Sequence, residues 1–317
     1  MMCPTSAEST IANSASSVWG CPVCGDARHQ RIGSVQHHPL HVCVACRLQF
    51  LHPQPTPTEL AAIYRDYYQA WGKLDEPAVQ AQVSAMKQQT FHGYLDILEH
   101  YGTKGGSLLD IGCATGDFLL AARQRGFAVH GVEISPEGIR RSRMLFGSAH
   151  IHAGSLDDTA FADHLFDIII LSDVLEHISD LKGLRRHILR LMQPRGMLLV
   201  VTPDAGSLSC RLMGTRWPHY KPEHLFYFQR GTIRAWLQDS FQLLVCQRAV
   251  KTLTPIYCGQ VLKQYGQFPL ARMTGRFFSS LPDFLGNRHV AVSLGEMLVV
   301  AKRASAPLGL EHSQPQT

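Results

Sequence analysis

The residues best suited to bind a ligand lie in one short segment, 108–116, which has the sequence Leu-Leu-Asp-Ile-Gly-Cys-Ala-Thr-Gly. An apolar run typical of a buried strand carries Asp110 near its end, and a turn with Gly112 and Gly116 leads into a predicted helix. Glycine permits the sharp turn and lets a ligand approach the main chain closely. Ala114 stands where a third glycine would complete the usual pattern, and its methyl group is small. The segment predicts a nucleotide-type site at the end of a strand.

A second acidic residue, Glu133, ends the next predicted strand, in Val-His-Gly-Val-Glu. At the carboxyl edge of a parallel sheet, such a carboxylate can accept hydrogen bonds from both hydroxyls of a ribose. These two features alone fit a nucleotide-dependent dehydrogenase equally well, so the cofactor stays open at this point.

Four of the nine cysteines form two Cys-x-x-Cys pairs near the N-terminus, separated by eighteen residues: Cys21, Cys24, Cys43 and Cys46. Two such turns can bring four thiolates to the corners of a tetrahedron, which is the geometry of structural zinc. Because four thiolates leave no open coordination position, we predict a structural site in a module too small to fold without its metal. A redox role for the pairs is the alternative.

Two further clusters could position a nucleophile for group transfer. The first, 173–177, follows the fourth predicted strand and so lies at the edge of the sheet where ligands bind. It contains Asp173 and His177, although local capping would explain its Glu-His pair equally well. The second, 217–224, gathers aromatic, acidic and imidazole groups in a loop that includes Tyr220, Glu223 and His224. We expect this second cluster to lie near the substrate.

Composition limits the class of protein. Hydrophobic residues make up 45% of the 317 residues and charged residues 17%, as in ordinary folded proteins. The sequence has no apolar run long enough for a transmembrane helix, and its first twenty residues, without Lys or Arg, do not resemble a secretory signal. The net charge of +5 is too small for a dedicated nucleic-acid binder. Five scattered cysteines argue against a disulfide framework and indicate a reducing, cytoplasmic location.

Five regions follow one another along the chain. Residues 1–20 are predicted to be a disordered lead-in, 21–52 the zinc-binding module, 53–104 a Pro-rich linker and helical lid, 105–303 an α/β domain, and 304–317 a disordered tail. Tyr64, Tyr67 and Tyr68 lie in the helical region and could cover a substrate.

Strand and helix signals alternate from 105 to 303, which predicts a mainly parallel sheet. The expected strands are 107–111, 128–132, 150–153, 166–171, 197–201, 241–250 and 296–301. The expected helices are 117–125, 136–145 and 184–192, the last ended by Pro194 and Gly196. The segment between the last two strands is predicted to be irregular, with many aromatic and basic residues.

Segments 108–116, 131–133, 167–178 and 193–202 together resemble the class I methyltransferases that use S-adenosylmethionine (SAM). The last segment resembles the Leu-x-Pro-Gly-Gly signature before an apolar strand, with Arg195 in place of the first glycine. The resemblance implies a Rossmann-like α/β fold with a seven-stranded sheet, here joined to a small N-terminal zinc-ribbon-like module.

The same resemblance assigns cofactor contacts. Asp110 and the backbone of Gly112, Ala114 and Gly116 would hold the methionine part of SAM, and Glu133 would bind the ribose. Ser155 and Leu156 match the adenine-contacting positions, with Asp173 at the same edge of the sheet. Many relatives have aspartate where this chain has Ser155, and Asp157 or Asp158 could supply that contact instead.

A zinc module followed by a Tyr-containing helix and this domain also resembles methyltransferases of bacterial polysaccharide and lipid biosynthesis, and nucleotide-sugar C-methyltransferases. That resemblance implies that His177, Tyr220, Glu223 and His224 act near the acceptor, in proton removal. The C-methyltransferases continue into a further C-terminal domain, whereas this sequence ends at Thr317. We therefore expect methyl transfer to oxygen rather than to carbon or nitrogen.

The expected acceptor is a small molecule, a sugar or a lipid-linked glycan. An RNA methyltransferase is one alternative, but the module has few basic residues (Arg28, Arg31 and Arg47) and little aromatic surface for bases. A non-catalytic SAM-binding scaffold is the other. Residues 253–289 could form an amphipathic patch in peripheral contact with a membrane, although packing against the last two strands is the expected role.

Overall fold

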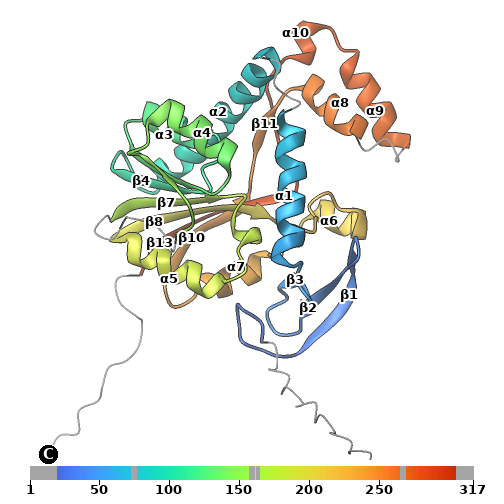
Figure 1. Cartoon of the computed structure of the whole chain (residues 1–317). Coiled ribbons are helices and arrows are strands. Elements are labelled where there is room, and N and C mark those ends of the chain that lie inside the picture. The colour runs from blue at the N-terminus through green and yellow to red at the C-terminus, as the bar shows by residue number, and fades with distance from the viewer. Residues whose placement is uncertain (1–19, 73–76, 157–160, 162–164, 265–268, 305–317) are drawn as a thin grey trace, which may run out of the picture.

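The computed structural model describes residues 20–72, 77–156, 161, 165–264 and 269–304 (Figure 1). The lead-in, except for Gly20, and the tail, except for Ala304, lie outside the described residues, as do Asp157 and Asp158. The side chains of Tyr67 and Tyr68 are not described either.

The centre of the molecule is a seven-stranded sheet in the order β10-β13-β8-β7-β4-β5-β6. Only β13 is antiparallel to its neighbours, since β4, β5, β6, β7 and β8 are parallel and β10 pairs antiparallel with β13. The Rossmann-like methyltransferase fold predicted from the sequence is confirmed. The strands are β4 Ser107–Ile111, β5 Ala128–Glu133, β6 Ile151–Ala153, β7 Phe166–Ser172, β8 Met192–Pro203, β10 Phe241–Arg248 and β13 Glu296–Arg303.

Helices cover both faces of this sheet (Figure 1). On one face lie α2 Pro77–His100, α3 Asp117–Gln124 and α4 Pro136–Phe146, and on the other α5 Leu181–Leu191 and α7 Arg230–Leu237. In β7, Ile168 and Ile170 pack with the α2 and α3 side, whereas Ile169 and Leu171 pack with the α5 and α7 side. A strand buried on both faces must be apolar throughout, which explains the continuous apolar run seen in the sequence.

A second, antiparallel sheet has the order β1-β2-β3-β9. The first three strands are β1 His29–Val35, β2 His38–Cys43 and β3 Gln49–Leu51, all from the cysteine module. The fourth, β9 Phe226–Tyr227, comes from the segment just after His224. The backbone N–H of Leu51 also donates to the carbonyl of Leu225 (3.1 Å). The module therefore shares a sheet with the predicted acceptor loop.

Helix α1 Pro57–Gly72 runs from the small sheet along the side of the molecule (Figure 1). It begins with a capping box, in which the Thr56 hydroxyl accepts from the Glu59 N–H (3.2 Å) and the Glu59 carboxylate accepts from the Thr56 N–H (2.7 Å). Two orphan donors at the helix start are satisfied in this way, which fixes the helix directly after the Pro-rich linker.

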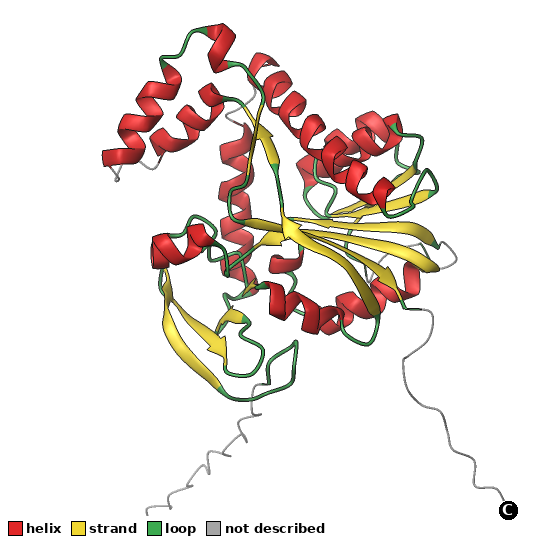
Figure 2. Ribbon diagram, turned by 180° about the vertical axis from the view of Figure 1, so that it is seen from behind, coloured by secondary structure: helices red, strands yellow, loops and turns green. Residues whose placement is uncertain are grey.

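The segment between β10 and β13 is not irregular, so that prediction is wrong. It forms β11 Lys251–Leu253, α8 Pro255–Gln264, α9 Pro269–Ser279, α10 Asp283–Gly286 and β12 Val290–Val292. Strands β11 and β12 pair as a two-stranded ribbon, and α8, α9 and α10 project beyond it, away from the sheet (Figure 2). Packing against the last two strands is therefore not what holds these helices. We call residues 254–289 the arm.

The bounds predicted for the helix at 184–192, and the role of Pro194 in ending it, also need correction. Helix α5 begins at Leu181, where Asp180 caps it by accepting from the Gly183 N–H (2.8 Å), and it ends at Leu191. Pro194 lies within β8 rather than between helix and strand. The ladder with β7 is irregular between Met192 and Met197, so Pro194 occupies a stretch without regular pairing and its missing N–H breaks no ladder bond.

No helix among the described residues is long and apolar enough to cross a membrane.

The fold predicts a stability effect at the joint between module and domain. Thr232 is fully buried on α7, and its hydroxyl donates to the backbone oxygen of Cys46 (2.9 Å). Thr232→Val removes the donor and leaves a buried carbonyl unpaired, which lowers the free energy of unfolding by about 1–3 kcal/mol. Urea denaturation checks this, with the exposed Thr215→Val as the control. Equal effects of the two substitutions would contradict the assigned contact.

Candidate active site

The glycine-rich loop lies at the carboxyl end of β4, in the middle of the sheet. The N–H groups of Gly112 and Cys113 both donate to the carbonyl of Val132 on β5 (2.8 and 3.0 Å). Gly112 has a φ of +76°, and a Cβ there would lie 2.5 Å from a methyl carbon of Val174. Only glycine satisfies both conditions without strain, and the contact brings the loop against the segment after β7.

Ala114 also adopts a left-handed conformation, with a φ of +47°. Its N–H donates to one carboxylate oxygen of Glu133 (2.8 Å). The other oxygen accepts from the N–H groups of Ile134 (2.9 Å) and Ser135 (2.7 Å). A carboxylate has about four acceptor positions, so these three bonds leave about one for a ligand hydroxyl. Glu133 thus fixes the loop in addition to its predicted contact with the ribose. The sequence pattern did not indicate this contact with the loop.

Asp110 is buried beneath this loop, at 3% exposure. Burial, and then the negative charge of Glu133, raise the pKa of Asp110 well above its ordinary value. A positively charged ligand beside this carboxyl group would oppose that shift, because it favours the ionised form. SAM carries both a sulfonium and an ammonium group, so its charge suits this site.

The predicted adenine positions follow β6. The Gly154 N–H donates to the carbonyl of Glu133 (2.9 Å), which holds the turn that carries Ser155 and Leu156 beside β5. Leu156 is buried in the core and Ser155 is half-buried. Both positions lie at the same edge of the sheet as Asp110 and Glu133.

Two histidines lie close together at this edge. His177, in the short turn η1 Leu175–His177, stands perpendicular to His224 with 4.7 Å between the ring centroids. Nδ1 of His177 lies 3.0 Å from the backbone oxygen of Glu223 and 3.0 Å from the hydroxyl of Tyr64. Because a carbonyl only accepts, Nδ1 carries the proton and Nε2 is left as a proton acceptor. Burial lowers the pKa of His177 to about 4.

His224 is buried, and burial followed by the charge of His177 places its pKa well below the ordinary value. Its ring bonds the backbone of His219, and its Nδ1 is buried without a hydrogen-bond partner among the described residues. Both imidazoles are thus neutral near pH 7, and each offers a lone pair.

Tyr220 and Glu223 are placed differently from the histidines. The Tyr220 hydroxyl donates to the side-chain oxygen of Gln49 in the cysteine module (2.7 Å), so it ties the loop to β3. Glu223 reaches His177 through its backbone oxygen, and its side chain is half-buried. The structure therefore brings His177 and His224 together and gives Tyr220 and Glu223 supporting contacts.

A charged cluster, which the sequence interpretation missed, lies at the same edge. Lys251 pairs with Glu296 (2.7 Å) and Asp173 (3.6 Å). Burial opposes the charge of Lys251, but the two carboxylates outweigh it and raise its pKa. The sequence feature that could have revealed this cluster is Glu296, an acidic residue at the start of an apolar strand. Because β13 runs antiparallel, its first residue lies at the carboxyl edge of the parallel strands.

Glu176 adds a further carboxyl group beside this cluster. It is 1% exposed, and its side chain accepts a hydrogen bond from the Thr202 hydroxyl (2.9 Å). Burial, and then the charge of Asp173, raise the pKa of Glu176 to about 8, so it carries a proton at neutral pH. With His177 and His224 it forms a group whose ligand atoms all lie within 4.8 Å of one another.

The four paired cysteines converge as predicted. The sulfurs of Cys21 and Cys46 lie 3.5 Å apart, as do those of Cys24 and Cys43, and all four lie within 4.8 Å of one another. For comparison, sulfurs bound to one zinc ion at 2.3 Å would be about 3.8 Å apart in a tetrahedron.

The backbone at the two pairs is nearly the same. In each, the N–H of the residue after the second cysteine, Gly25 or Arg47, donates to the carbonyl of the first (2.8 and 3.1 Å). Both of these residues have a positive φ, +78° and +65°. Two equivalent turns present four thiols to one point, so these residues could hold a metal ion.

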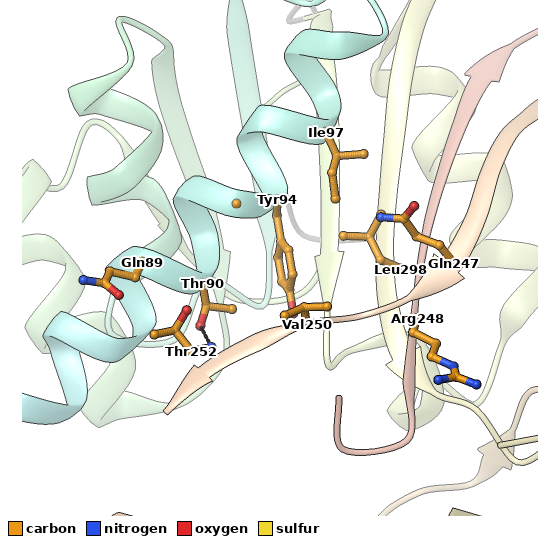
Figure 3. A pocket seen from close by; sticks show the side chains of 10 residues that line it. Gln89, Thr90, Tyr94, Ile97, Gln247, Arg248, Val250, Thr252 and Leu298 are labelled. Carbon is orange, nitrogen blue, oxygen red and sulfur yellow. Dashed lines mark hydrogen bonds between the residues drawn. The ribbon is translucent and has the colours of Figure 1, made fainter. Parts of the chain in front are cut away.

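A separate pocket lies between α2 and the segment from β10 to β11 (Figure 3). It is lined by Tyr94, Ile97, Arg248, Val250 and Leu298, among others. None of the predicted site residues contributes to it, and Arg248 is its one charged lining residue. We therefore place the chemistry at the carboxyl edge of the sheet and not here.

Comparison with known proteins agrees with this geometry. Residues 85–240, just under half of the chain, match the family described as a methyltransferase domain. A malonyl-[acyl-carrier protein] O-methyltransferase of Serratia marcescens is 32% identical over 113 residues, which cover 36% of this chain and 44% of that protein. A ubiquinone biosynthesis O-methyltransferase of Pseudomonas fluorescens is 27% identical over 109 residues, covering 33% and 47%. The matched segments thus span less than half of each relative.

Solved structures show similar proteins at low identity. A SAM-dependent methyltransferase from Thermotoga maritima is 14% identical, with a TM-score of 0.48, covering 77% of this chain and 99% of that one. The geranyl diphosphate C-methyltransferase of Streptomyces coelicolor, in complex with S-adenosylhomocysteine, is 17% identical, with a TM-score of 0.43, covering 65% and 73%. The family match and the sequence relatives thus show that residues 85–240 are similar to methyltransferase domains.

The environment of Asp110 predicts how SAM affinity depends on pH. A cationic ligand favours the ionised carboxylate, so binding releases a proton wherever the free protein holds Asp110 protonated. Affinity then rises with pH, by at most about tenfold per unit, and levels off above the raised pKa. Asp110→Asn weakens binding and flattens this dependence. Calorimetry across pH checks both; an identical pH dependence in the variant would contradict the assignment.

Proposed function

We propose that this protein catalyses methyl transfer from SAM to an oxygen atom of a small-molecule, sugar or lipid-linked glycan acceptor. The observation that carries the proposal is a pair of neutral imidazoles, the half-buried His177 and the buried His224, at the edge of the sheet that also holds the cofactor loop. A hydroxyl acceptor must lose its proton during transfer, and a lone pair held in place near the reacting oxygen can take it. The names of the O-methyltransferases of Serratia and Pseudomonas support oxygen as the acceptor atom.

SAM supplies an electrophilic methyl group when it is bound. His224 is the proposed base, because its Nδ1 is buried and lacks a hydrogen-bond partner within the described chain. When the acceptor hydroxyl is methylated, its proton would pass to Nδ1 of His224. The perpendicular ring of His177 holds His224 in place, and the backbone of Glu223 holds His177 in turn.

The cluster of Lys251, Asp173 and Glu296 is the proposed polar wall of the acceptor pocket. Asp173 is about half exposed, at 46%, so its carboxylate can meet an acceptor hydroxyl while it stays paired with Lys251 (3.6 Å). Hydroxyl-bearing acceptors fit such a wall better than purely apolar ones, since each buried polar group needs a partner.

Transfer to carbon is the alternative. The resemblance of His177, Tyr220, Glu223 and His224 to groups of the nucleotide-sugar C-methyltransferases favours it, and the Tyr64 hydroxyl lies 3.0 Å from Nδ1 of His177 at the same edge. Nothing comparable supports an RNA acceptor, because Arg28 of the module is already paired with Asp26 (2.8 Å). Mass spectrometry of the product separates O-methyl from C-methyl.

We further propose that Cys21, Cys24, Cys43 and Cys46 bind one structural zinc ion. Four converging thiols on two equivalent turns fit the ion, and we place the protein in the reducing cytoplasm, where thiols are available to bind a metal. Zinc would stabilise β3, which pairs with β9 directly after His224. The proposed ion thereby supports the acceptor loop without taking part in the chemistry.

The role of His224 predicts a split between turnover and cofactor binding. His224→Ala lowers turnover about 10²–10⁴-fold, as expected for loss of a positioned base, and changes SAM affinity less than about threefold. The assay follows labelled methyl from SAM into quinols, nucleotide-sugars and polyprenyl-linked glycans, with the exposed His100→Ala as control. A variant with clearly weakened SAM binding but unchanged turnover at saturating SAM would instead assign His224 to cofactor binding.

The metal proposal predicts about one zinc per chain by elemental analysis. Cys43→Ser lowers the zinc content, and in hydrogen exchange it exposes the β3 and β9 amides. SAM affinity stays close to wild type, because Glu133 and the glycine-rich loop lie on the other sheet. The buried Cys210→Ser, outside the cluster, is the matched control. A fully folded wild-type protein without metal would contradict the assignment.

A further inference from the structure

The outer face of helix α9 on the arm combines exposed apolar and basic side chains. Met273 and Phe277 are 68% and 62% exposed, and Arg272 and Arg276 alternate with them. The spacing of these four residues, i, i+1, i+4 and i+5, places them on one stripe of the helix. On α10, Phe284 is 74% exposed. Phenylalanines this exposed are unusual on a protein surface that has no partner.

The opposite face of α9 is occupied within the arm. A Cβ on Gly259 of α8 would lie 2.9 Å from the backbone oxygen of Gly275, so the two helices cross in close contact. Gly275 is buried and Phe278 is half-buried, on the inner side. The inner face thus holds the helical hairpin together, and the outer stripe contributes nothing to the packing of the described chain.

The arm is also strongly basic. Its sequence contains Lys263, Arg272, Arg276 and Arg288, against a single acidic residue, Asp283. None of the three arginines forms an ion pair with any residue that the structure describes. Their charges are therefore available to an anionic partner.

A second protrusion has the same composition. Helix α6 Leu208–Met213 exposes Leu208 (65%) and Leu212 (77%), with the exposed Arg211 between them. It lies on the same side of the molecule as the arm, to the right in Figure 1. Helix α6 directly follows the carboxyl end of β8, so this side is also near the proposed acceptor pocket.

We propose that the arm, together with α6, docks on the surface of an anionic lipid bilayer. Exposed aromatic and aliphatic side chains would enter the interface, and the flanking arginines would meet lipid phosphates. A second copy of this chain fits less well, because a twofold contact through the arm would place basic faces opposite each other. This inference goes beyond the proposed function and needs no methyl acceptor for its test.

The test is flotation of the full-length, zinc-loaded protein with vesicles. We expect binding to vesicles of equal parts phosphatidylglycerol and phosphatidylcholine, and at least tenfold weaker binding to phosphatidylcholine alone. Arg272→Gln/Arg276→Gln lowers the partition coefficient about fivefold per arginine, hence about 25-fold, and high salt has a similar effect. Met273→Glu/Phe277→Glu abolishes binding to both kinds of vesicle.

Matched controls carry the same changes elsewhere on the surface. Met144→Glu/Leu145→Glu on α4 also replaces two exposed apolar residues, and Arg186→Gln/Arg190→Gln on α5 also removes two exposed charges. Both should bind vesicles like wild type, and circular dichroism verifies folding. Failure of the wild-type protein to float, or equal losses in control and arm variants, would overturn the proposal. Sedimentation showing a dimer that Met273→Glu/Phe277→Glu dissociates, without vesicle binding, would assign the face to a second copy.

Discussion

The carboxylate of Glu133 is the interaction on which the cofactor site depends. It is buried at the end of β5 and accepts hydrogen bonds from three backbone N–H groups, one of which belongs to the left-handed residue Ala114. A left-handed non-glycine residue costs about 1–2 kcal/mol, and these charge-assisted bonds offset that cost. Burial raises the pKa of Asp110, and the charge of Glu133 raises it further, so Glu133 affects both the shape of the loop and the electrostatics beneath it.

The acceptor side depends on a different constraint, the sharing of one small sheet between distant parts of the chain. Strand β9 is only two residues long and follows His224 directly, so it could not hold a position alone. Three contacts fix it instead. Strand β9 pairs with β3, the Tyr220 hydroxyl donates to the side chain of Gln49, and the Leu225 N–H donates to the backbone oxygen of Glu176. The cysteine module therefore positions the acceptor loop, while the cofactor loop belongs to the central sheet.

Much of this arrangement was predictable from local patterns. The apolar strands and the turn at Gly112 depend on short-range sequence and on burial, so the seven strands lie within a few residues of their expected positions. The Cys-x-x-Cys turns are local as well. The helices of the arm were not predictable from the spacing of apolar residues. These residues are divided between an inner helix–helix contact and an exposed stripe, so they do not mark a single apolar face of each helix.

Other features depend on pairings between distant residues, which no local pattern shows. The salt bridge from Lys251 to Glu296 needs the reversal of β13, and Tyr220 finds Gln49 across 171 positions. The hydroxyl of Tyr220 ties the loop before β9 to β3, and its part in proton removal, which the resemblance implied, stays a prediction. His177 and His224 meet only because η1 and the loop before β9 end at the same edge.

The central claim is that the loop between β4 and α3 binds SAM rather than a dinucleotide, and one titration tests it most directly. Calorimetry of the full chain with S-adenosylhomocysteine and, separately, with NADH compares the two ligand classes at the same site. We predict binding of about one S-adenosylhomocysteine per chain and none of NADH, with Glu133→Ala weakening the former. Binding of NADH without S-adenosylhomocysteine would contradict the account.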